Sequence, residues 1–223
     1  MPERREEADL EERDRPPTPP VVWLLTGSLV AAYAAYLAAP ADGQRFAEYT
    51  FGLIPERFHA EKQYRFEHWW GAPAALLGHA WLHLGWLHLG LNAFFLFGTS
   101  RLVALRLGAA RYLLVYIAAV LGGAALFLAF NWNEQNIAVG ASGGVCGMFT
   151  AFFFATRRTW RDALADPRLR GSLGALVLLN VILMGIASEA GMLRIAWESH
   201  LGGFIGGGFA YALLQPRARG PWG

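Results

Sequence analysis

Residues 140–147 read Gly-Ala-Ser-Gly-Gly-Val-Cys-Gly, and this glycine-rich stretch around Ser142 opens an apolar segment that continues to Thr156. Arg157 and Arg158 follow directly and mark a membrane boundary. From Ser142 to Thr156 the chain forms about 22 Å of helix, less than the roughly 30 Å hydrocarbon core of a bilayer. We therefore expect a short membrane helix whose first residue, Ser142, lies below the outer surface within reach of water.

The composition of the whole chain is that of a membrane protein. Of the 223 residues, 55% are hydrophobic and only 16% are charged, which is unusual for a soluble domain. The single cysteine, Cys146, excludes an internal disulfide and a cysteine-based zinc site. A net charge of +2 gives no indication of nucleic-acid binding. We expect an all-α polytopic protein in contact with the lipid bilayer.

Apolar segments in six places predict transmembrane helices. They are residues 21–39, 85–105, 109–130, 141–156, 172–190 and 197–214. Residues 40–84, between the first two segments, are rich in Pro, Trp and His and predict a long membrane-associated loop. We expect one membrane domain over residues 21–214, a disordered charged tail at 1–20 and a short tail at 215–223.

The basic residues predict the orientation of the chain. With the N-terminus in the cytoplasm, the inner segments hold fourteen of the Arg and Lys residues and the outer segments hold five. Both termini are therefore expected in the cytoplasm, with six crossings between them.

A histidine in a second glycine-rich segment is the expected partner of Ser142. His200 lies near the outer end of the last predicted span, at the depth expected for Ser142, and ionisable residues inside spans are costly. Gly203 and Gly207 share its helical face, which lets another helix approach closely. If that face packs against the Ser142 helix, His200 can accept the hydroxyl proton and so activate the serine as a nucleophile.

Ser142 also has a purely structural interpretation, because serine is a favoured helix cap and Gly143 and Gly147 form a packing face. The presence of His200 at a matching depth favours the catalytic interpretation. No carboxylate convincingly completes a triad, since Glu198 projects about 200° away from His200 on a helical wheel. The residues therefore predict a Ser-His dyad.

Further polar residues open the second predicted span. His88 and Asn92 are four residues apart and share one helical face, so they can donate hydrogen bonds to an oxyanion beside the Ser142 backbone amide. His79 and His83 are interpreted as hydrogen-bonded core or interfacial residues. A metal or haem site in this histidine cluster is a rival interpretation. It is weakened because, in a continuous helix, His79 and His83 point nearly opposite to His88, and no acidic or cysteine ligand accompanies them.

This combination resembles the rhomboid family of intramembrane serine proteases. The resemblance rests on Gly140-Ala-Ser142-Gly143, on His200-Leu-Gly-Gly203-Phe-Ile-Gly-Gly207, on His83, His88 and Asn92 in the spacing His-x4-His-x3-Asn, and on residues 51–58, which are similar to bacterial members.

The resemblance implies a six-helix fold with a membrane-embedded first loop. It implies Ser142 as nucleophile and His200 as general base, with His88, Asn92 and the Ser142 amide around the oxyanion and Gly140, Gly143, Gly203, Gly207 and His83 as structural residues. It also implies hydrolysis of transmembrane protein substrates near their outer ends, with the fifth helix as a gate. No metal or organic cofactor is expected, and the bacterial inner membrane is the expected location.

The sequence departs from the family pattern at two positions. Ala104-Leu-Arg106 stands where many members have Glu-x-Arg, so an inner-end ion pair is absent, and Cys146 stands where an aromatic residue often packs against the base. A protease-dead relative that binds transmembrane clients is an alternative, which loss of Ser142 or His200 would favour; both are present. Neither the natural substrate nor the oligomeric state can be read from the sequence.

Overall fold

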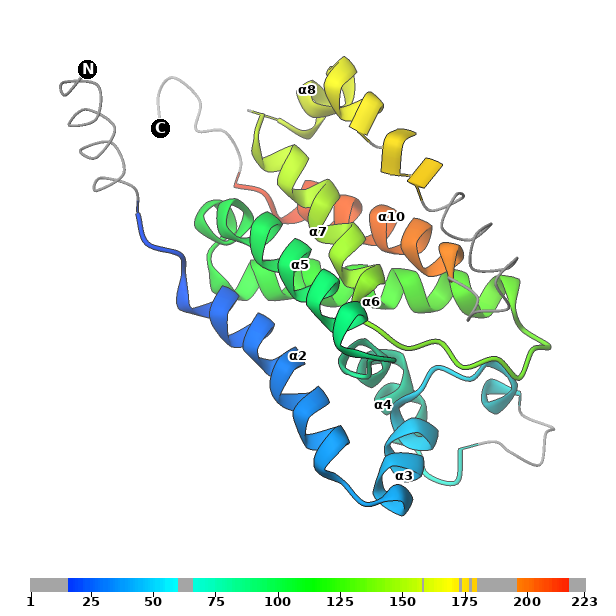
Figure 1. Ribbon diagram of the computed structural model, residues 1–223. Helices are drawn as coiled ribbons and strands as arrows, with labels where there is room; N and C mark the ends of the chain where they lie inside the picture. Colours follow the sequence, from blue (N-terminus) through cyan, green and yellow to red (C-terminus); the bar gives the residue numbers. More distant parts are fainter. Residues whose placement is uncertain are drawn as a thin grey trace.

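The computed structural model describes residues 16–59, 66–157, 159–172, 174–176, 178–179 and 196–216. These residues form a bundle of helices (Figure 1). In chain order the elements are α2 (Pro20–Ala38), α3 (Ala41–Phe51), the 3₁₀ turn η1 (Pro55–Phe58), α4 (Gly71–Gly78), the 3₁₀ turn η2 (His79–Trp81), α5 (Trp86–Leu107), α6 (Ala109–Phe130), α7 (Ser142–Ala155), α8 (Trp160–Ala165) and α10 (Trp197–Leu214).

Within the described residues, three helices are long and apolar enough to cross a membrane: α2, α5 and α6. The helix α7 is apolar but has only 14 residues, as expected for the segment that begins at Ser142. The sixth predicted segment forms a helix with the predicted bounds, Trp197–Leu214. The chain is thus a polytopic helical membrane protein. Most of the predicted fifth span, 172–190, and of the predicted tails, 1–20 and 215–223, lies outside the described residues.

The helices α6, α7 and α10 form the centre of the bundle, and α10 packs most extensively against α6. The helix α5 packs on α7, and α2 lies at the edge against α5 (Figure 1). A single residue, Gly108, joins α5 to α6 with a φ of +76°, which favours glycine. Apolar side chains such as Leu87, Phe94 and Phe209 face outward, as expected for helices whose surroundings are lipid.

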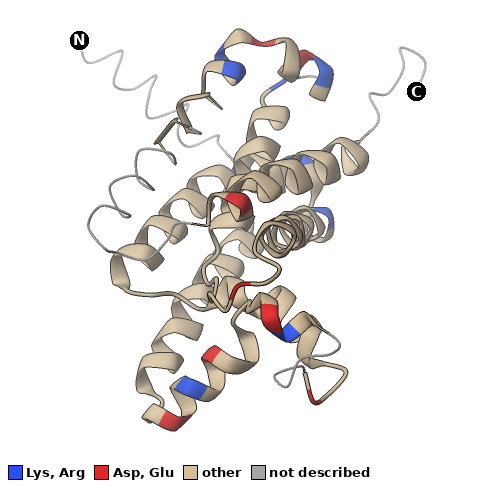
Figure 2. Cartoon of the chain, turned by 90° about the vertical axis from the view of Figure 1, so that its right-hand side faces the viewer, with Lys and Arg blue, Asp and Glu red and all other residues tan. Residues whose placement is uncertain are grey.

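Charged residues lie mainly at the two ends of this bundle. Figure 2 shows ribbon coloured for basic and acidic residues in the segment that contains α8 and on α3 at the opposite end, with few coloured positions on the helices between them. Near the junction of α5 and α6, the hydroxyl of Tyr112 in α6 donates to Ser100 Oγ of α5 at 2.9 Å, and both residues are buried. This bond joins α5 and α6 close to Ala104, where the expected ion pair is absent.

The described residues of the long first loop, 40–59 and 66–84, are attached to the rest of the protein at several points. Trp81 Nε1 donates to Ser28 Oγ of α2 at 2.9 Å. Leu53 and Ala138 exchange backbone hydrogen bonds of 3.1 and 3.0 Å, which connect the loop to the segment that leads into α7. The loop therefore supports the chain immediately before Ser142.

Candidate active site

Ser142 is the first residue of α7, and its side chain does not cap the helix. Ala141 occupies the cap position, where no side-chain hydrogen bond is present, and the Val145 N–H donates to the Ala141 carbonyl at 2.9 Å. The helix is about 21 Å long, against about 33 Å for the 22 residues of α6. The segment after α6 therefore returns into the bundle before Ser142. The structural interpretation of Ser142 as a cap is wrong.

The hydroxyl of Ser142 lies 2.8 Å from Nε2 of His200, across 58 residues of sequence. His200 is in the first turn of α10, and both side chains are partly buried. When Nδ1 carries the proton, Nε2 accepts the hydrogen bond from the Ser142 hydroxyl. This is the distance at which a histidine can remove the proton of a nucleophile.

Glycines on α7 and α10 bring these two residues together. A methyl group at Gly203 would lie 2.7 Å from the carbonyl carbon of Gly143, and one at Gly207 would lie 2.6 Å from that of Gly147. No side chain fits between the helices at either level without displacing backbone. The small residues that the sequence indicated on both helices therefore meet in pairs.

The helix α6 also packs closely against the start of α10. This contact was not predicted from the sequence. A methyl group at Gly123 would lie 2.8 Å from the Ser199 carbonyl oxygen, and one at Gly202 would lie 2.8 Å from the carbonyl carbon of Gly122. The signal was available in the sequence, because Gly122-Gly123 interrupts an otherwise apolar span. The residue that precedes His200 is thus held by α6 on one side and α7 on the other.

His88 lies beside the turn that leads into α7. Gly140 has a φ of +120°, and a methyl group there would stand 2.7 Å from His88 Nε2. The Leu84 N–H lies 3.5 Å from His88 Nδ1, a long hydrogen bond, and when Nδ1 accepts it the neutral ring carries its proton on Nε2. His88 therefore presents an N–H donor next to the start of α7.

Asn92 is buried one turn further along α5. Its Nδ2 donates to the His88 carbonyl oxygen at 3.0 Å, so this bond runs along its own helix. The structure thus brings His88 to the start of α7 and leaves Asn92 directed at backbone.

His79 and His83 precede α5 and are buried. Burial lowers the pKa of each to about 4, so both imidazoles are neutral near pH 7. His79 Nδ1 lies 3.0 Å from the Ala75 carbonyl oxygen, and the His79 carbonyl accepts the Gly140 N–H at 2.8 Å. These contacts fit the structural role expected of His79.

The chain between His83 and α5 is not a continuous helix. Residues 82–85 interrupt it, and the His83 ring centroid lies 5.1 Å from that of His88. The orientation expected for a continuous helix, with His83 nearly opposite to His88, therefore does not occur. His83 packs against the ring of the proposed oxyanion donor, although no group of three His, Cys, Asp or Glu suited to a metal is found among the described residues.

Two further residues near the dyad were singled out from the sequence. The Glu198 carboxylate accepts a hydrogen bond from Asn131 Nδ2 at 3.4 Å, so it is engaged with the end of α6. Cys146 is buried one turn after Ser142 on α7. Neither observation adds a carboxylate to the Ser142–His200 pair.

Known proteins are similar to this chain over its membrane region. The family model described as "Rhomboid domain" matches residues 67–217. Rhomboid protease GluP of Bacillus subtilis (strain 168) is 28% identical over 155 residues, which cover 70% of this chain and 28% of GluP. RHOMBOID-like protein 5 of Arabidopsis thaliana is 27% identical over 144 residues, which cover 64% of this chain and 45% of that protein. The chain thus spans less than half the length of these relatives.

Proposed function

The chain belongs to the rhomboid family, and on that premise we propose that it is an intramembrane serine endopeptidase. Its substrates are other transmembrane proteins, which it cuts in or near their membrane segments. The observation that carries the proposal is the 2.8 Å contact between Ser142 Oγ and His200 Nε2. The relative named a rhomboid protease supports the same activity.

The reaction begins with attack of Ser142 Oγ on the carbonyl carbon of the scissile peptide bond. His200 Nε2 accepts the hydroxyl proton as the new C–O bond forms. The imidazolium then gives this proton to the leaving amine as the C–N bond breaks, which leaves an acyl ester on Ser142. Water, activated by the neutral His200, hydrolyses the ester and regenerates the hydroxyl.

The negative charge on the carbonyl oxygen is stabilised by donors at the start of α7. Ser142 is the first helical residue, and the N–H groups of a helix's first turn have no partner within the helix. His88 Nε2 is a second donor, supported by its position against Gly140. The positive end of the α7 dipole adds to this stabilisation. Asn92 contributes after its side chain turns away from the His88 carbonyl.

The membrane topology that fits this activity has six crossings in residues 21–214, with both termini in the cytoplasm. The bias of Arg and Lys toward one set of segments supports this orientation. The short α7 supports a location of Ser142 below the opposite surface. The bacterial inner membrane is the proposed location, in line with the resemblance of residues 51–58 to bacterial members.

Cleavage of a reporter transmembrane substrate in liposomes tests this function. Wild-type protein is compared with Ser142→Ala and His200→Ala, and with the matched controls Ser172→Ala and His68→Ala, whose side chains are exposed. We expect the first two variants to lose cleavage and the controls to retain it. Undiminished cleavage by Ser142→Ala or His200→Ala would refute the dyad. Binding of transmembrane clients by wild type, with no cleavage across a panel of substrates, would favour the protease-dead alternative.

A further inference from the structure

The segment that follows α7 is rich in arginine, and we call residues 156–172 the basic turn. It contains five arginines and two aspartates, so its formal charge is +3. It starts directly at the end of an apolar membrane helix, where a bilayer changes from hydrocarbon to headgroups. The basic turn is therefore at the height of lipid phosphates.

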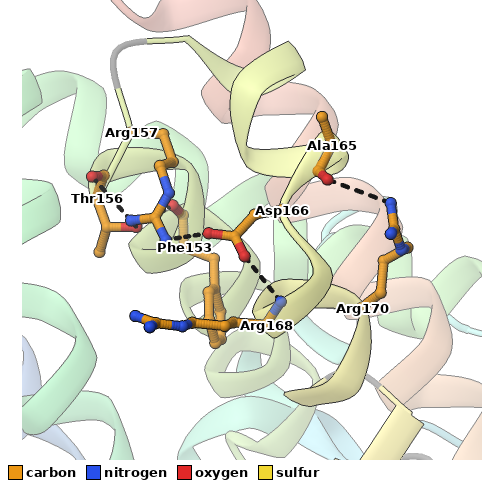
Figure 3. Close-up of polar contacts among 7 residues, drawn as sticks. All are labelled: Phe153, Thr156, Arg157, Ala165, Asp166, Arg168 and Arg170. Carbon is orange, nitrogen blue, oxygen red and sulfur yellow. Dashed lines mark hydrogen bonds and ion pairs between the residues drawn. The ribbon is translucent and has the colours of Figure 1, made fainter.

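Both carboxylates of the basic turn are already engaged within the chain. Asp162 accepts hydrogen bonds from the N–H and the hydroxyl of Thr159, in a capping box that starts α8. Asp166 pairs with Arg157 and accepts the Arg168 N–H at 2.7 Å, as Figure 3 shows. These bonds hold the backbone of the basic turn, and Asp166 forms its ion pair with Arg157, so the formal charge of the turn stays positive.

Three further arginines of the basic turn are Arg161, Arg168 and Arg170. All three residues are exposed, and within the described part of the chain none of them forms a salt bridge. Arg170 Nη1 donates to the Ala165 carbonyl oxygen at 3.3 Å, as Figure 3 shows, and to that of Leu164 at 3.5 Å.

The opposite side of the basic turn is apolar and packs on the bundle. Ala163 and Leu169 are buried, and Trp160 packs against the core beneath the Arg161 guanidinium, which lies 5.3 Å from its ring centre. Leu164 is 47% exposed beside the arginines. A basic surface with an adjacent exposed leucine is suited to a lipid surface, where the leucine contacts acyl chains and the arginines contact phosphates.

We propose that the basic turn binds the headgroups of anionic phospholipids through Arg161, Arg168 and Arg170. The charge of the surface selects an anionic headgroup, and its position at the end of a membrane helix, together with Leu164, selects a lipid over a soluble anion. Bound lipid holds the inner end of α7 at the headgroup level. Because α7 has a fixed length, this contact also fixes the depth of Ser142.

Lipid-dependent stability tests the proposal without reference to proteolysis. The melting temperature is measured in detergent micelles that contain either dioleoyl phosphatidylglycerol or dioleoyl phosphatidylcholine, and retained lipid is counted by native mass spectrometry. We expect phosphatidylglycerol to raise the melting temperature and to be retained, and phosphatidylcholine to do neither. In the double variant Arg161→Gln/Arg168→Gln, the increase in melting temperature caused by phosphatidylglycerol should be less than about half of the wild-type increase. Its melting temperature without lipid reports whether it folds.

Matched controls separate this site from general positive charge. Arg111→Gln removes an exposed arginine at the start of α6, and Arg45→Gln removes one on α3. Both should respond to phosphatidylglycerol as wild type does. If phosphatidylglycerol raised the melting temperature of the double variant as much as that of wild type, the proposal would be overturned. The same holds if Arg111→Gln lost as much of this rise as the double variant does. A rise of the same size with glycerol 3-phosphate at equal phosphate concentration would also overturn it, because the ligand would then be a free anion.

Discussion

Gly203 of α10 lies directly against the backbone of Gly143 in α7, with only 2.7 Å between a methyl group built on Gly203 and the Gly143 carbonyl carbon. Gly143 is the residue after Ser142, and Gly203 is one turn after His200. The contact between two glycines therefore fixes the distance between the two groups of the proposed dyad. Neither residue needs to touch a substrate to have this effect.

Gly203→Ala should separate α7 from α10 and weaken both stability and activity. We expect a loss of about 1–3 kcal/mol in the free energy of unfolding, because the added methyl meets backbone that cannot move aside cheaply. Cleavage should fall further than stability alone explains, since the Ser142–His200 distance grows. Thermal unfolding and cleavage rates measure the two effects. The control is Gly98→Ala in α5, where nothing lies within 4 Å, and a loss of equal size there would contradict the explanation.

His88→Ala should lower the rate of cleavage with little change in folding. If Nε2 donates to the oxyanion, we expect kcat to fall by about 10²–10³ and KM to change little, because this hydrogen bond forms mainly in the transition state. Steady-state kinetics on the reporter substrate give both constants. His68→Ala serves as the control, and an unchanged kcat in His88→Ala would remove His88 from the oxyanion site.

The buried bond between Tyr112 and Ser100 should stabilise the contact between the end of α5 and the start of α6. We expect Ser100→Ala to cost about 1–3 kcal/mol in the free energy of unfolding, because the Tyr112 hydroxyl loses its partner in a buried position. Removing both groups, in Ser100→Ala/Tyr112→Phe, should cost less than the sum of the single changes. A double-mutant cycle by thermal unfolding measures this coupling. Additive effects would show that the bond does not compensate for the missing ion pair near Ala104.

The sequence predicted the elements whose limits depend on local composition. The segments 109–130 and 197–214 coincide with α6 and α10, because an apolar run of membrane length bounded by polar residues or glycine leaves few alternatives. The short length of α7 followed from the same reasoning. The approach of His200 to Ser142 could therefore be expected before the helices were seen together.

Features that depend on contacts between distant segments were not predicted. The first loop contains α3 and α4, which pack against each other, and no periodic pattern in residues 40–84 indicated them. The interruption at residues 82–85 turns His83 toward His88, and the pairing of Gly123 with Ser199 depends on how α6 crosses α10. Local sequence patterns do not specify such crossings.

Covalent labelling of Ser142 by a fluorophosphonate probe, read by intact mass and by peptide mapping, tests whether His200 activates Ser142. A serine that His200 activates should react with the probe, whereas the many other serines and threonines should not. We predict one adduct per chain, located on Ser142, which disappears in Ser142→Ala and forms far more slowly in His200→Ala. Labelling of Ser142 at an undiminished rate in His200→Ala, or labelling of another residue in preference to Ser142, would contradict a Ser142–His200 dyad.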